Sequence, residues 1–200
     1  MRSRRKESGF TLLELMVTVV ILSILAVVAV ASYKRYSMAA RTQEAINFLY
    51  EIKMKQETYY QAYGQYVTAD WSSPFLFIGT VGDPSSATPN QWEFDCTSSD
   101  ATTRGWCDLG ARTGFNECPT EAGIQCTWFR FTTTGWAPGA PDPGAVTIAD
   151  RTMDPAIRDT TRRWWYAAAE GDLDFDGEAS GYWITSELNQ VVELWNGAKY

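Results

Sequence analysis

An acidic segment near the C-terminus has residue types suited to binding a metal ion. In GDLDFDGEASGYW (171–183), three alternating aspartates fit the first, third and fifth positions of a calcium loop, and Gly177 fits the sixth. Trp183 stands at the twelfth position, where such a loop carries a bidentate glutamate. An acidic hairpin tip that only keeps a sheet edge soluble would have the same composition. The candidate calcium ligands are Asp172, Asp174, Asp176, Glu178 and Ser180.

The sequence contains no set of residues that points to catalysis. The 200 residues include no histidine, which removes the most common general base and transition-metal ligand. A glycine-rich phosphate loop, a nucleophile elbow and paired catalytic carboxylates are also missing from the sequence. The formal net charge is -7, and from Phe10 onward acidic groups outnumber basic ones by ten, which disfavours contact with nucleic-acid phosphates. We therefore predict a non-enzymatic protein that binds no nucleic acid.

One carboxylate, Glu14, lies at the start of a long apolar run. A basic octapeptide precedes this run, and from Leu15 to Tyr33 there are 19 consecutive residues without a charge. At about 1.5 Å per helical residue, such a run can cross a bilayer core of about 30 Å. A charged group this close to a membrane span is energetically costly, so Glu14 requires a functional explanation.

The residues around Glu14 resemble the processing site of type IV prepilins and of the pseudopilins of type II secretion. Gly9 is followed by FTLLEL, with the glycine, the phenylalanine, the Thr-Leu pair and the glutamate in register directly before the apolar run. The resemblance implies that prepilin peptidase cuts between Gly9 and Phe10 and that Phe10 becomes N-methylated. An ordinary secretory signal is the alternative, with Val30-Ala31-Ser32 as a cleavage site, but Glu14 interrupts its apolar region.

The resemblance also implies a role for Glu14 in assembly. In the family this glutamate is thought to pair with the N-terminal amine of a neighbouring subunit, which would relieve the penalty on a carboxylate in a low-dielectric setting and fix the register between helices. Simple snorkelling of Glu14 to the headgroups is the alternative. Many major pilins carry glycine and proline where this chain has Ser23 and Ala31, a difference that favours a minor pilin or a pseudopilin.

Charge and cysteine content predict the location of the chain. Basic residues before the span place the N-terminus in the cytoplasm, so the region from about residue 36 onward is exported to an oxidising compartment. Two disulfides are then expected. Three connectivities are open, with a preference for pairing neighbours, among Cys96, Cys107, Cys118 and Cys126.

Hydrophobic periodicity predicts one helix over residues 10 to about 63, stopped by Gly64. Its amphipathic half has an apolar stripe, widened by Ile46 and Tyr60, that comprises Ala45, Leu49, Ile52, Gln56, Tyr59 and Tyr63. Four segments are expected: a leader (1–9), a transmembrane and filament-core helix (10–35), the amphipathic half of the helix (36–66) and a globular, β-rich head (67–200).

Alternating apolar and aromatic residues predict an antiparallel sheet of four or five strands in the head. The expected strands are 91–96, 125–133, 163–169, 181–185 and 191–195, with a short strand or tucked loop at 75–78 and a further segment at 146–149. The sum is an α+β pilin architecture, in which the amphipathic half of the helix packs on the sheet.

The resulting hypothesis is a structural subunit of a type IV pilus. It would enter the inner membrane as a prepilin and self-assemble, with the pilus or secretion machinery, into an extracellular helical filament that serves motility, adhesion or surface attachment. A pseudopilin of a type II secretion system is the nearest alternative. A non-assembling, membrane-tethered binding module, for which tryptophans such as Trp71 and Trp136 could contact a surface or carbohydrate, is an alternative from a different class.

Overall fold

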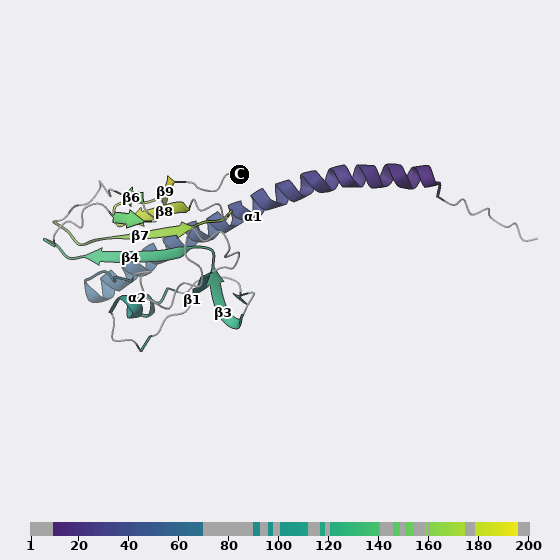
Figure 1. Cartoon of the computed structure of the whole chain (residues 1–200). Helices are drawn as coiled ribbons and strands as arrows, with labels where there is room; N and C mark the ends of the chain where they lie inside the picture. The colour runs from purple at the N-terminus through teal and green to yellow at the C-terminus, as the bar shows by residue number, and fades with distance from the viewer. Residues whose placement is uncertain are drawn as a thin grey trace, which may run out of the picture. The chain divides into compact units, whose positions relative to one another are not determined.

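The computed structural model describes residues 10–69, 90–92, 96–97, 101–111, 117–118, 121–140, 146–148, 151–153, 159, 161–174 and 179–195. The chain divides into two compact units, Met1–Ala39 and Ala40–Tyr200. Figure 1 shows the described elements coloured along the chain. The boundary between the units falls within the first helix, four residues after the end of the predicted membrane segment.

The long helix α1 spans Leu12–Tyr63, or 52 residues, as the sequence predicts. Neither proline nor glycine occurs within it, so no residue removes a backbone donor or loosens a turn. It ends where Gly64 adopts a left-handed backbone, with φ of 69°, and donates its N–H to the carbonyl of Tyr60 at 2.8 Å. Glycine adopts this conformation without a Cβ clash, which explains the position of the stop.

The head contains a four-stranded antiparallel sheet in the order β4-β7-β8-β9. Its strands are β4 (Arg130–Trp136), β7 (Trp164–Gly171), β8 (Ser180–Thr185) and β9 (Val192–Trp195). The part of α1 beyond Ala40 packs on this sheet, and the Phe48 and Phe131 rings meet edge to face at 4.6 Å. This arrangement confirms the predicted α+β pilin fold (Figure 1).

The buried stripe of α1 matches the prediction at its centre and departs from it at its end. Ala45, Leu49, Ile52 and Gln56 are buried, and so is Phe48, which the predicted stripe omits. Tyr63, expected on the buried stripe, is 68% exposed, and Tyr60 is also exposed. The prediction was wrong for these two tyrosines, which lie in the last turn of α1, directly before its end at Gly64.

Smaller elements complete the described part of the head. A three-stranded sheet has the order β1-β3-β2, formed by β1 (Asn90–Trp92), β2 (Glu117–Cys118) and β3 (Glu121–Thr127). A two-stranded sheet joins β5 (Val146–Ile148) to β6 (Arg151–Met153). One further helix, α2, spans Ala101–Leu109.

Two features differ from the strand predictions. The prediction of a single strand over 125–133 is wrong. Trp128 and Phe129 separate β3 from β4, and these two strands belong to different sheets. Helix α2 was not predicted, since Gly105 weakens its helical pattern. That glycine is required for packing: a Cβ there would collide with the carbonyl oxygen of Thr68. The segment expected at 75–78 lies outside the described residues.

Candidate assembly site at the start of the long helix

The first turn of α1 is capped by a threonine and carries a glutamate at its third position. Thr11 precedes the helix, and its Oγ1 accepts a hydrogen bond from the backbone N–H of Glu14 at 3.2 Å. The Thr11 hydroxyl also lies 3.5 Å from Glu14 Oε2, to which it donates. A threonine followed three residues later by glutamate is the sequence of a capping box, which satisfies backbone donors that a helix start leaves open. This local role of Glu14 was not predicted from the sequence.

The apolar side chains that follow are exposed along the first unit. Phe10 is 74% exposed and Leu12 is 78% exposed, and every other large apolar side chain described up to Val30 is at least half exposed. Exposed apolar surface on this scale is unfavourable in water and requires lipid or other protein surfaces. By length and composition α1 can cross a membrane, since an 18-residue window within it has a mean hydropathy of 2.8.

Hydroxyl groups inside the apolar segment bond to the helix backbone. Thr18 donates to the carbonyl of Leu15 at 2.8 Å, and Ser23 donates to the carbonyl of Val19 at 2.8 Å. In hydrocarbon an unpaired hydroxyl is costly, and bonding it to a backbone carbonyl of the preceding turn removes that cost. The segment therefore presents lipid, or another apolar helix, with one formal charge between Phe10 and Tyr33, on the side chain of Glu14.

Comparison with protein families matches residues 4–30 to the prokaryotic N-terminal methylation motif, the hallmark of type IV prepilins and pseudopilins. The motif supports assignment of the chain as a type IV pilin-like or pseudopilin protein. It implies processing by prepilin peptidase and assembly into pilus-type filaments. No curated protein and no solved structure gives a significant match. Gly9 lies outside the described residues, so cleavage before Phe10 and the intermolecular pairing of Glu14 remain predictions.

The candidate calcium loop is described only in part. Asp172 and Asp174 follow β7, and Ser180 begins β8, the next strand of the sheet. Asp176 and Glu178 lie outside the described residues. Within the described portion of the chain, no three acidic, cysteine or histidine side chains are placed to hold a metal ion. The calcium site therefore remains a prediction.

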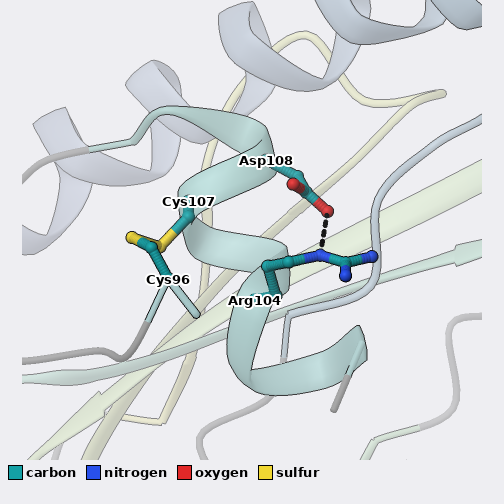
Figure 2. The surroundings of a disulfide bond; sticks show 4 residues. All are labelled: Cys96, Arg104, Cys107 and Asp108. Carbon is teal, nitrogen blue, oxygen red and sulfur yellow. Dashed lines mark hydrogen bonds and ion pairs between the residues drawn. A yellow bond between two sulfur atoms is a disulfide. The ribbon is translucent and has the colours of Figure 1, made fainter. Parts of the chain in front are cut away.

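A disulfide joins Cys96 to Cys107 on α2, with their Cα atoms 5.7 Å apart (Figure 2). This is the first of the two neighbour pairs preferred from the sequence. Cys118 lies in β2 and Cys126 in β3, which are adjacent antiparallel strands. Their side chains are outside the described part of the structure, so the second pair remains a prediction.

Two polar residues of α1, Gln56 and Glu57, form hydrogen bonds to other parts of the head. Neither was predicted to have a function from the sequence. Gln56 is fully buried, and its Nε2 donates to the Val67 carbonyl at 2.7 Å and to Thr133 Oγ1 at 2.8 Å. Glu57 Oε1 accepts from the indole nitrogen of Trp165 at 3.0 Å and from the Tyr66 hydroxyl at 3.5 Å. Burial, Glu57 and Tyr60 raise the pKa of Tyr66 to about 12.

A cation and a half-buried carboxylate lie nearer the start of the amphipathic half of α1. The guanidinium carbon of Arg41 lies 3.6 Å from the centre of the Trp128 ring, a cation–π contact. Burial raises the pKa of Glu44, against the opposing effects of hydrogen bonds from Thr127 and Trp128 and of the charge on Arg41. These contacts hold α1 against the chain between β3 and β4.

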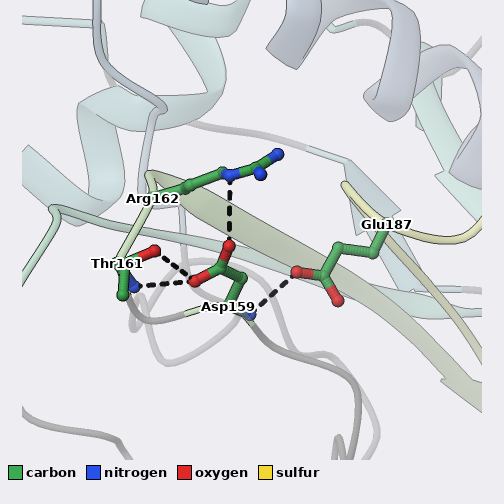
Figure 3. Close-up of polar contacts among 4 residues, drawn as sticks. All are labelled: Asp159, Thr161, Arg162 and Glu187. Carbon is green, nitrogen blue, oxygen red and sulfur yellow. Dashed lines mark hydrogen bonds and ion pairs between the residues drawn. The ribbon is translucent and has the colours of Figure 1, made fainter.

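Ion pairs and turn contacts order the sheet. Arg130 of β4 contacts the fully buried Glu170 of β7 at 2.8 Å. Figure 3 shows a second group at the ends of β7 and β8, in which the Asp159 backbone N–H donates to Glu187 Oε1 at 2.8 Å. Hydrogen bonds from Thr161, followed by the charge on Arg162, lower the pKa of Asp159. These groups are structural, and they bring no catalytic set together.

Proposed function

We propose that this protein is a structural subunit of a type IV pilus. Filament assembly would bury the apolar surface between Phe10 and Val30 against the same surface of neighbouring subunits. The observation that carries the proposal is this exposed apolar segment, with its single carboxylate at the third position of the helix and the methylation motif around it. Burial of apolar area at about 25 cal/mol per Å² would supply the cohesion.

In this proposal residues 1–9 are the leader, 10–35 the membrane and filament-core segment, 36–66 the amphipathic half and 67–200 the head. The prepilin resides in the inner membrane with its N-terminus in the cytoplasm, and the processed subunit moves into an extracellular filament. The carboxylate of Glu14 forms an ion pair with the charged N-terminal amine of Phe10 in a neighbouring subunit. This pairing favours one axial offset between helices. The filament then serves motility, adhesion or surface attachment.

Shearing cells that express Glu14→Ala tests this assembly role. We expect processed protein in the membrane and a loss of at least tenfold in sheared filaments, because the charge pairing that selects the register is removed. Glu51→Ala, on the same helix but beyond the membrane segment, is the matched control and should assemble normally. Filaments of wild-type yield from Glu14→Ala would contradict the proposed register role.

A pseudopilin of a type II secretion system is the second candidate. The uninterrupted α1, with Ser23 and Ala31 where many major pilins have glycine and proline, favours a pseudopilin or a minor pilin over a major pilin. The pseudopilin assignment predicts processed wild-type chain in the membrane fraction only, together with a secretion defect on deletion. An uncut monomer in the membrane would instead support the tethered binding module.

A further inference from the structure

A surface pocket of about 220 Å³ lies in the head where the end of α1, the segment after it and α2 meet. It is smaller than the range of about 300–1,000 Å³ typical of sites for drug-sized ligands, which suits a single-ring ligand. All of its lining residues belong to the second unit. They are Tyr59, Gln65, Tyr66, Val67, Thr68, Arg104 and Asp108.

The polar wall of the pocket is an ion pair on α2. Arg104 Nε lies 3.3 Å from Asp108 Oδ2, and the two side chains are 46% and 38% exposed (Figure 2). This contact uses one nitrogen and one oxygen, so the terminal guanidinium nitrogens and the second carboxylate oxygen can reach a ligand. The pair is neutral as a whole, which disfavours a charged ligand. The guanidinium donors of Arg104 lie beside the carboxylate acceptor of Asp108. Together they match two adjacent hydroxyl groups of a ligand, because each hydroxyl both donates and accepts hydrogen bonds.

Two tyrosines, Tyr59 and Tyr66, also line the pocket. The rings of Tyr59 and Tyr63 lie 4.4 Å apart, and the Tyr66 ring stacks on that of Tyr60 at 4.7 Å. The hydroxyl of Tyr66 is directed to Glu57, so its ring orientation is set from within the head. Aromatic side chains combine an apolar face with a polar edge, and such a face can pack on the C–H face of a sugar ring.

The walls are held in place before a ligand arrives. Gly105 brings α2 against the backbone of Thr68 and Ala69, closer than any residue with a Cβ could come. Thr68 Oγ1 accepts from the Gly135 N–H at 3.2 Å, which leaves the hydroxyl hydrogen to donate elsewhere. A pre-organised site loses less conformational freedom on binding.

We propose that this pocket binds one uncharged sugar unit, with the Arg104–Asp108 pair contacting adjacent hydroxyls and Tyr59 packing on the ring. This binding is independent of filament assembly. It would give the head an affinity for carbohydrate surfaces, at about millimolar Kd for one sugar unit.

Saturation-transfer NMR on the full chain in a detergent without sugar groups tests the proposal. The probes are glucose, galactose, mannose and N-acetylglucosamine, each up to about 50 mM, with acetate as an anionic probe. We expect transfer to at least one sugar. Arg104→Gln should weaken this binding about tenfold, because hydrogen bonds to a charged donor are lost. Failure of all four sugars to bind, or acetate binding as tightly as the best sugar, would overturn the proposal.

Arg162→Gln is the matched control, since Arg162 also pairs with a nearby aspartate but lies outside the pocket. It should keep sugar binding within twofold. Equal losses in the two variants would place the binding elsewhere and refute the assignment. Tyr59→Leu is a second variant, and it should weaken binding while an unchanged Tm shows that the head is folded. Sugar binding by a protein that forms no filaments would leave this inference standing while the proposed function failed.

Discussion

The side-chain amide of Gln56 and the backbone of Val67 form two reciprocal hydrogen bonds, as the backbones of two neighbouring strands do. Gln56 Nε2 donates to the Val67 carbonyl at 2.7 Å, and the Val67 N–H donates to Gln56 Oε1 at 2.9 Å. The same Nε2 reaches Thr133 of β4 at 2.8 Å. One buried amide therefore joins the helix, the chain that leaves it and the main sheet.

Replacing Gln56 by leucine should destabilise the head by about 2–4 kcal/mol, because the buried N–H and C=O of Val67 lose their partner. Denaturant unfolding of the full chain in detergent, followed by tryptophan fluorescence, measures this change. Gln43→Leu, an exposed position on the same helix, is the control and should change stability by less than about 0.5 kcal/mol. Equal stabilities for the two variants would refute this stabilising role of Gln56.

The Tyr66 phenol should titrate well above an ordinary tyrosine. Its pKa is raised from 10.0 to about 12, so the folded protein holds this proton more tightly than the unfolded chain. Its contribution to stability is therefore complete below pH 10.0 and is lost as the pH rises through about 12. Absorbance at high pH should show a late phase that disappears in Tyr66→Phe and persists in the exposed control Tyr63→Phe. A late phase retained in Tyr66→Phe would contradict this assignment.

The Cys96–Cys107 disulfide should stabilise α2 and the segment before it. Its partners are 11 residues apart in sequence, and closing a loop of this size contributes about 2–3 kcal/mol. The double variant Cys96→Ser, Cys107→Ser should lower Tm, and reductant should then have less effect than on wild type. Peptide mapping without reduction should recover the linked pair. Recovery of Cys96 linked to Cys118 or Cys126 would refute the connectivity.

The threonine cap should stabilise the first turn of α1. Thr11→Ala removes the acceptor for the Glu14 N–H, at a cost of about 1 kcal/mol, so amide exchange at Glu14 should accelerate about fivefold. Ser23→Ala, which removes a hydroxyl that donates to the Val19 carbonyl, is the control. Exchange at Glu14 that is equally fast in the wild type and in Thr11→Ala would show that the cap contributes nothing.

The sequence predicts the features that depend on local chemistry. A long helix without glycine or proline, ended by Gly64, follows from backbone preferences, and β7, β8 and β9 follow from their branched and aromatic residues. What it does not predict depends on distant partners. The sequence places Gln56 in an apolar stripe, because its hydrogen-bond partners Val67 and Thr133 are distant in the chain. Gly105 disfavours a helix by its local propensity, and only its packing against Thr68 explains why α2 contains a glycine.

The candidate assembly site shows the same division. The motif at Gly9, Phe10 and Glu14 is readable from adjacent residues, and the family comparison matches it. The Thr11 cap can also be predicted from adjacent residues, because a threonine three residues before a glutamate is the sequence of a capping box. The acidic loop includes residues outside the described part of the structure, and the side chains of the second cysteine pair are not described, so both remain predictions.

Intact mass and N-terminal sequence of the protein from sheared surface filaments test the central proposal most directly. The account predicts an abundant chain that begins at N-methylated Phe10. A processed chain confined to the membrane would favour the pseudopilin, and an uncut chain that begins at Met1 would contradict the account.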